Sequence, residues 1–225
     1  MILAAGRGER MRPLTDRLPK PLVPVCGAPL IEHHIKKLVA AGVRRIIINV
    51  SYLAESLMQV LGHGERFDCE LIYSIESSPL ESGGGIATAS VHFCSDAIIL
   101  VSADIYSDLD YASLLPRISA IEKGQIQSHF VMVAPTVGEP GGEFAVGPNG
   151  RVHMGEPRMT LANIAVLATA PCRTWPRSER FKLLPYYQQI VEAGVVSGEV
   201  FGGVWKNVTT AADIDLLNAA QAALN

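Results

Sequence analysis

The chain opens with Met1-Ile2-Leu3-Ala4-Ala5-Gly6-Arg7-Gly8-Glu9-Arg10-Met11-Arg12-Pro13-Leu14-Thr15 and continues to Lys20-Pro21. This run sets a short apolar strand directly before a loop that has glycines at positions 6 and 8. Glycines allow backbone N–H groups to approach phosphate oxygens without interference from a Cβ atom. Arg10 and Lys20 then supply positive charge, which can offset the negative charge that moves in phosphoryl chemistry. The stretch therefore predicts a loop that holds a triphosphate.

Two better-known nucleotide loops also begin with a strand and glycines, and neither fits this chain. In the dinucleotide turn Gly-x-Gly-x-x-Gly the third glycine would fall at Met11, and no acidic residue ends a second strand about 20 residues further on. A Walker loop needs Gly-Lys-Ser/Thr at a fixed spacing after its first glycine, which this sequence does not have. A purely structural turn stays open as an alternative, because Gly and Pro also punctuate ordinary turns.

The opening stretch resembles the Leu-Ala-Ala-Gly-x-Gly-x-Arg-Met/Leu-x-Pro-Leu-Thr…Pro-Lys-Pro signature of sugar-1-phosphate nucleotidyltransferases. The resemblance implies transfer of a nucleotidyl group from a nucleoside triphosphate to a sugar 1-phosphate, with release of pyrophosphate. It implies catalytic roles for Arg10, as a clamp on the departing phosphates, and for Lys20, as a charge at the α-phosphate. It also implies that the nucleotide lies against Leu3, Ala4, Ala5, Gly6 and Gly8. A solvated lysine between two prolines is the alternative for Lys20.

Composition limits the class of protein. The 225 residues are 48% apolar, enough for one large core, so we expect a single nucleotidyltransferase domain over 1–225. The net charge of −3 comes with no basic stripe, so no nucleic-acid partner is expected. No apolar run approaches the roughly 18 residues of a membrane span, and no signal peptide is evident. We expect a cytoplasmic protein without a membrane partner, monomeric or weakly dimeric, and leave open whether residues precede Met1 in the native chain.

Apolar strands and amphipathic helices alternate along the chain, which predicts the fold. Strands are expected at 1–5, 45–50, 69–74, 97–103, 129–134, 144–146, 161–167 and 202–205, and helices at 30–41, 85–93, 183–193 and 211–223. Thr209-Thr210 can cap the last helix. This order predicts a single-domain, Rossmann-like α/β fold with a doubly wound, mostly parallel mixed sheet, and ligands at the carboxyl ends of its strands. The family resemblance implies the nucleotidyltransferase variety of this fold, which is glycosyltransferase-A-like.

Two positions concern a metal ion. The apolar run from Ile98 ends in Asp104, where the resemblance implies a magnesium ligand for the triphosphate, although Ala103 replaces the glycine usual in the family. Trp205-Lys206-Asn207-Val208-Thr209-Thr210 stands where the family has Trp-x-Asp-x-Gly-Thr, and that aspartate is the second magnesium ligand. Asn207 can coordinate Mg²⁺ through its amide oxygen but brings no charge, so the affinity for Mg²⁺ should be lower than usual.

The remaining site residues are also implied by resemblance. Leu80-Glu81-Ser82-Gly83-Gly84-Gly85 is similar to the family loop that closes over the nucleobase, which implies that Gly83 and Gly84 lie against the base. A turn that caps the next helix is the alternative. Glu143, Glu156 and Asn163 are similar to positions that bind sugar hydroxyls, although surface glutamates in loops are common.

Among the branches of the family, the triple glycine and the short chain look most like bacterial N-acetylmuramate-1-phosphate uridylyltransferases of cell-wall recycling. The implied substrates are UTP and N-acetylmuramate 1-phosphate. Two alternatives stay open. The chain could be a nucleotide- or sugar-binding relative with weak or no catalysis, because Asn207 replaces the metal-binding aspartate. It could also act on a glucose- or mannose-type sugar phosphate.

Overall fold

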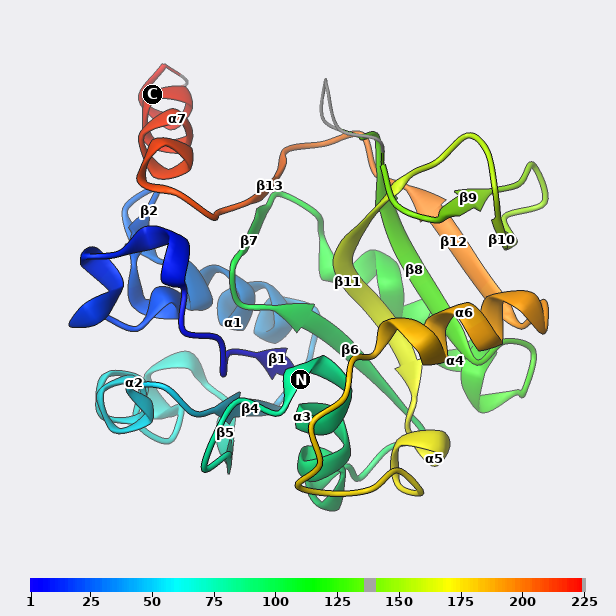
Figure 1. The fold of residues 1–225 in the computed structure, drawn as a ribbon, viewed down its shortest axis with the longest axis horizontal. Coiled ribbons are helices and arrows are strands. Elements are labelled where there is room, and N and C mark those ends of the chain that lie inside the picture. The colour runs from blue at the N-terminus through cyan, green and yellow to red at the C-terminus, as the bar shows by residue number, and fades with distance from the viewer. Residues whose placement is uncertain (136–140, 224–225) are drawn as a thin grey trace.

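A seven-stranded mixed sheet runs through the protein (Figure 1) in the computed structural model, which describes residues 1–135 and 141–223. The strands are β1 Ile2–Leu3, β2 Pro24–Val25, β3 Ala28–Pro29, β4 Arg45–Val50, β5 Glu70–Ile75, β6 Ala97–Ser102, β7 Ile105–Ser107, β8 Ser128–Val133, β9 Phe144–Val146, β10 Val152–Met154, β11 Thr160–Ala168, β12 Val196–Val200 and β13 Trp205–Asn207. The α-helices are α1 Leu30–Ala40, α2 Ala54–Leu61, α3 Glu81–Ala89, α4 Leu115–Glu122, α5 Thr169–Cys172, α6 Leu184–Glu192 and α7 Ala211–Ala222.

The large sheet has the order β12-β8-β11-β6-β1-β4-β5, and β11 alone runs against its neighbours in it. The predicted mostly parallel mixed sheet is confirmed. Because β11 is reversed, its first residues lie at the edge where the parallel strands end, next to the carboxyl end of β6. Residues from β1, β4, β6 and the start of β11 therefore meet at one edge of the sheet.

The side chains of the strands alternate between two apolar layers, as period-two strands require. Ile48 and Val101 face one layer, which helices α1, α2 and α4 cover, whereas Ile47 and Leu100 face the other, which α3 and α6 cover. Helices thus lie on both faces of the sheet, as Figure 1 shows, and the doubly wound expectation is confirmed. Both layers are buried, which explains why the central strands are continuous apolar runs.

The structure corrects several predicted boundaries. Helix α3 begins at Glu81 rather than Gly85, because glycine's low helix propensity hides its first turn in the sequence. The last predicted strand lies at Trp205–Asn207, and 202–204 precede it. Helices α2 and α4 and the edge strand β12 were not predicted. Each has eight residues or fewer and so carries little periodicity.

Smaller elements hold the C-terminal segment beside the sheet edge. Strand β13 pairs with β7, and α7 begins with a capping box in which Thr210 and Asp213 bond each other's backbone, so the predicted cap is confirmed at Thr210. Helix α7 packs its Leu217 against Val25 and Leu30. Within 1–135 and 141–223, none of the helices is both long and apolar enough to cross a bilayer.

Candidate active site

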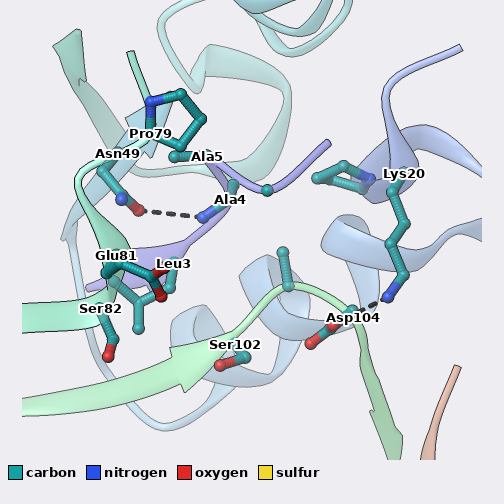
Figure 2. A pocket seen from close by; sticks show the side chains of 13 residues that line it. Leu3, Ala4, Ala5, Lys20, Asn49, Pro79, Glu81, Ser82, Ser102 and Asp104 are labelled. Atoms are coloured by element: carbon teal, nitrogen blue, oxygen red, sulfur yellow. Dashed lines mark hydrogen bonds and ion pairs between the residues drawn. The ribbon is translucent and has the colours of Figure 1, made fainter. Parts of the chain in front are cut away.

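A cavity of about 360 Å³ opens at the carboxyl edge of the sheet, on the face that α3 covers. Its lining comes from the loop after β1, the 20–21 turn, the ends of β4 and β6, and the start of α3: Leu3, Ala4, Ala5, Gly6, Lys20, Pro21, Asn49, Pro79, Glu81, Ser82, Ser102, Ala103 and Asp104. Figure 2 shows Leu3 and Ala4 from one wall with Lys20 and Asp104 beyond them. Six of the residues singled out from the sequence thus share one cavity: Leu3, Ala4, Ala5, Gly6, Lys20 and Asp104.

Lys20 and Asp104 form an ion pair on one side of this cavity, with Lys20 Nζ 2.8 Å from Asp104 Oδ2. The side chain of Lys20 is only 10% exposed, so it is not the solvated surface lysine of the alternative interpretation. The aliphatic stem of Lys20 lies against Gly8, where an added Cβ would come within 3.0 Å of Lys20 Cβ. Gly8 has a φ of +69°, which glycine adopts without strain. The absence of a side chain at Gly8 also leaves space for the stem of Lys20.

Asn207 lies beside Asp104, although it does not line the cavity. It pairs with Ile105 in the β7–β13 ladder, and the N–H of Val208 donates to the carbonyl of Asp104 at 2.9 Å. In the described part of the chain, Asn207 Oδ1 is buried and has no hydrogen-bond partner. An aspartate carboxylate and an unpaired asparagine amide oxygen are both oxygen donors of the kind Mg²⁺ prefers, so the chemistry of these two side chains fits a magnesium site. They are not accompanied by a cluster of three or more His, Cys, Asp or Glu ligands anywhere in 1–135 or 141–223.

Lys206 directly precedes Asn207 on β13. Its ammonium pairs with Asp213 Oδ1 at 2.9 Å, so its charge is neutralised at the start of α7 rather than directed at the metal position. Burial alone would raise the pKa of Asp213. Hydrogen bonds from Lys206, Thr209 and Thr210 outweigh it and hold the pKa of Asp213 well below its ordinary value. The cation therefore anchors the strand that carries Asn207.

Arg10 does not line the cavity. It lies in a 3₁₀ turn over Glu9–Met11 and is exposed to solvent. The structure thus places its guanidinium outside the cavity walls, and its role as a phosphate clamp stays a prediction.

Gly83 and Gly84 are buried in α3 and pack against the segment before α6, away from the cavity lining. A Cβ on Gly84 would lie 2.0 Å from the carbonyl oxygen of Glu179, and one on Gly83 would lie 2.4 Å from the ring of Phe181. Both N–H groups donate to the carbonyl of Phe181. These contacts explain why both residues are glycine without invoking a nucleobase. The same loop instead presents Glu81 and Ser82 to the cavity.

Glu81 was not predicted as a site residue. Its φ of +63° is unusual for a non-glycine residue, and such conformations concentrate at functional sites. Its carboxylate pairs with Arg180 at 2.8 Å, which ties the start of α3 to the segment before α6. No pattern in the sequence could have shown this, because backbone conformation and the partner both depend on the folded chain.

A second cavity of about 200 Å³ adjoins the first and shares Leu3, Ser82 and Ser102 with it. Asn163 lines it, on a bulged part of β11 where its φ is +55°. The rest of the lining is largely apolar: Leu100, Leu161, Ile164, Ala165, Leu183, Leu184 and Tyr187.

The other two sugar-binding candidates lie outside both cavities. The carboxylate of Glu143 accepts a hydrogen bond from Gln188, and the exposed Glu156 pairs with Arg158 at 2.9 Å. Of the three residues implied by resemblance, Asn163 therefore lines a cavity, whereas Glu143 and Glu156 are paired with other protein side chains.

Known proteins of one family resemble this chain. Residues 1–144 match the family described as "Nucleotidyl transferase". Over 214 residues the chain is 33% identical to the N-acetylmuramate alpha-1-phosphate uridylyltransferase of Neisseria meningitidis serogroup B, covering 93% of this chain and 92% of that protein. The chain belongs to the sugar-1-phosphate nucleotidyltransferase family.

Other relatives match over shorter stretches. A mannose-1-phosphate guanylyltransferase of Mycobacterium tuberculosis is 34% identical over 51% of this chain, but over only 32% of its own length. Among solved structures, one described as a putative glucose-1-phosphate thymidylyltransferase from Bacillus anthracis superposes with a TM-score of 0.85, covering 100% of this chain and 95% of that one at 17% identity. The superposition supports the fold.

Proposed function

We propose that this protein transfers the uridylyl group of UTP to N-acetylmuramate 1-phosphate, giving the nucleotide sugar and pyrophosphate. The observation that carries the proposal is the similarity to the Neisseria meningitidis uridylyltransferase along nearly the whole of both chains. The match to the guanylyltransferase of Mycobacterium tuberculosis covers only 51% of this chain and 32% of that protein, so it supports the type of reaction rather than these particular substrates. We further propose that residues 1–225 act as one domain, in the cytoplasm, within peptidoglycan recycling.

The two adjoining cavities support a division of the site. The larger cavity is lined by the loop after β1, Lys20 and Asp104, which suit a triphosphate. The smaller cavity is lined by Asn163 and by mostly apolar side chains. An N-acyl sugar that carries a lactyl group has methyl groups to bury, which glucose and mannose lack. Burial of such groups contributes about 0.8 kcal/mol per carbon. The apolar lining thus favours the amino-sugar acceptor over a hexose phosphate.

In the proposed reaction, a phosphate oxygen of the sugar phosphate attacks the α-phosphorus of UTP in line, and pyrophosphate departs. Two polyanions must be held together, so the chain chiefly supplies positioning and positive charge. Lys20 offsets charge at the α-phosphate, and exposed Arg10 would reach the departing phosphates from the loop beside it. Since the N–H of Ala4 is committed to Asn49 Oδ1 at 2.9 Å, the loop N–H groups that face phosphate begin at Ala5.

We propose that Mg²⁺ is held by Asp104 and Asn207 together with triphosphate oxygens. The metal would supply charge that offsets the negative charge of the triphosphate. Asp104 also accepts a hydrogen bond from Lys20. When the nucleotide enters, the ammonium of Lys20 can exchange this carboxylate for a phosphate oxygen.

One experiment tests the proposal. The protein is incubated with Mg²⁺, each nucleoside triphosphate and a panel of sugar 1-phosphates, and pyrophosphate release is measured. The expected result is release with UTP and N-acetylmuramate 1-phosphate above all other pairs. Preference for GTP with mannose 1-phosphate would overturn the assignment, and nucleotide binding without release would favour the binding relative that Asn207 suggests.

A further inference from the structure

A buried hydrogen-bond relay joins two walls of the larger cavity. Asn49 Oδ1 accepts from the N–H of Ala4 at 2.9 Å, and Asn49 Nδ2 donates to Glu76 Oε1 at 2.7 Å. The other carboxylate oxygen, Glu76 Oε2, accepts from the N–H of Leu80 at 2.9 Å. Figure 2 shows the first of these bonds, with Asn49 beside Ala4. The relay thus runs from the loop after β1, through β4 and the end of β5, to the turn before α3.

The side chains of the relay are buried. Asn49 is 3% exposed and Glu76 is 4% exposed. Helix α3 lies directly on it, because a Cβ on Gly85 would stand 2.6 Å from Asn49 Nδ2 and 2.8 Å from Glu76 Oε1. Gly85 is therefore glycine because the relay occupies the space beside it.

Only one assignment of donors and acceptors satisfies all the hydrogen bonds of the relay. Two N–H donors, from Asn49 and Leu80, converge on the side chain at position 76, so that side chain must accept twice. A carboxylate does this, whereas a glutamine would turn its own NH₂ group toward one of the donors. Burial raises the pKa of Glu76, and its two hydrogen bonds act in the opposite direction. Glu76 thus carries the free-energy cost of burying a carboxylate, although it does not line the cavity.

We propose that Glu76 is a positioning residue for nucleotide binding, which acts through Asn49 to fix the distance between the 4–6 loop and the 79–82 turn. The inference rests on the proposed function in one respect, namely that a nucleoside triphosphate occupies the space between these walls. Loss of the relay leaves Lys20 and Asp104 untouched, because both lie on the far side of the cavity. The expected effect is on affinity for the nucleotide, with turnover at saturating nucleotide largely kept.

A pair of substitutions can reverse the relay and so test it. In Glu76→Gln, two amide groups face each other and one donor loses its acceptor. In Asn49→Asp, two carboxylates face each other. In the double variant, the new carboxylate at position 49 accepts from the N–H of Ala4 and from the new amide at position 76, whose oxygen accepts from the N–H of Leu80. The double variant therefore restores every bond with the charge moved to position 49.

The measurement is calorimetric binding of UTP, and separately of GTP, with Mg²⁺ and without a sugar phosphate, followed by KM and kcat where turnover occurs. Each single variant is expected to raise the Kd for the nucleotide about tenfold or more, and the double variant to return it to within about threefold of wild type. The KM for the sugar phosphate should change little. Glu32→Gln is the matched control, because Glu32 is a carboxylate buried in α1 against Arg66 and Lys36, outside both cavities.

Three outcomes overturn the inference. Wild type that binds neither nucleotide removes the proposed function and the inference with it. Wild type that binds while Glu76→Gln binds as tightly as Glu32→Gln removes the inference alone. A double variant no better than the singles does the same, because restoring the hydrogen bonds would then have no effect on nucleotide binding. If Glu76→Gln does not fold, Gly85→Ala replaces it, because a methyl group there pushes on the relay and should raise the Kd. An unchanged Kd in Gly85→Ala would then count against the proposal.

Discussion

Lys20 Nζ lies 2.8 Å from Asp104 Oδ2, so the cation expected to act on the α-phosphate is paired with the carboxylate expected to hold the metal. The two residues reach this position from a turn near the N-terminus and from the end of β6. Each neutralises the charge of the other. In the proposed function a bound nucleotide competes with Asp104 for Lys20, so we expect the pair to link the charge at the α-phosphate to the metal position.

Lys20→Met should lower kcat about 100-fold while the fold survives. Methionine keeps the aliphatic stem that packs on Gly8 and removes only the charge. Pyrophosphate release and circular dichroism measure the two effects, with Lys123→Met, an exposed lysine, as the control. A variant with wild-type kcat would show that Lys20 serves only to pair with Asp104.

Asn207→Asp should lower the Mg²⁺ concentration for half-maximal activity about tenfold, because it restores a charged ligand. Asp104→Asn should abolish activity, since it removes the carboxylate of the donor set. Magnesium titrations of pyrophosphate release test both. An Asn207→Asp curve that coincides with wild type, or an active Asp104→Asn, would refute this metal position.

Gly84→Val should destabilise the fold by about 2 kcal/mol, because its side chain would meet the carbonyl of Glu179. The helix and the segment before α6 would have to separate. Urea unfolding gives the change, and Gly202→Val, where nothing lies within 4 Å of an added Cβ, is the control. Unchanged stability together with lost nucleotide binding would instead support a direct role of Gly84 at the base.

Asn163→Gly should raise the KM for the sugar phosphate about tenfold and leave the KM for the nucleotide unchanged. Glycine adopts the positive φ of this position freely, so the variant removes only the amide. Glu156→Ala, on an exposed residue paired with Arg158, should change either KM less. Equal effects of the two substitutions would mean that the smaller cavity is not the sugar site.

Asp213→Asn should destabilise the protein at pH 7 by about 1 kcal/mol, as loss of a helix-capping carboxylate does. The pKa of Asp213 is depressed, so its contribution is present above the ordinary value of 3.8 and is lost as the pH falls through the folded value. The difference in unfolding free energy between wild type and variant should therefore shrink below about pH 4. Urea unfolding across this range measures it. A difference that stays constant would mean that Asp213 gains nothing from ionisation.

The amino-acid sequence by itself determined the class of fold and pointed to six of the residues that line the larger cavity. Apolar runs such as Arg45–Val50 matched strands residue for residue, because a strand buried on both faces needs little beyond its own side chains. The glycine loop and Asp104 were evident because each follows a strand, and the carboxyl ends of parallel strands share one edge, whereas Lys20 was implied by the family resemblance. The capping residue Thr210 was evident for a similarly local reason.

The tertiary structure decided what depends on partners distant in the chain. Whether Gly84 faces a base or a backbone carbonyl was settled by Glu179, and whether Lys206 faces the metal position was settled by Asp213. Glu76 is an ordinary glutamate in sequence and becomes a buried double acceptor only when β4, β5 and α3 meet. Local spacing encodes the elements and their ends. A hydrogen bond between side chains that lie far apart in sequence depends on the packing of those elements, so its partners cannot be identified until the chain has folded.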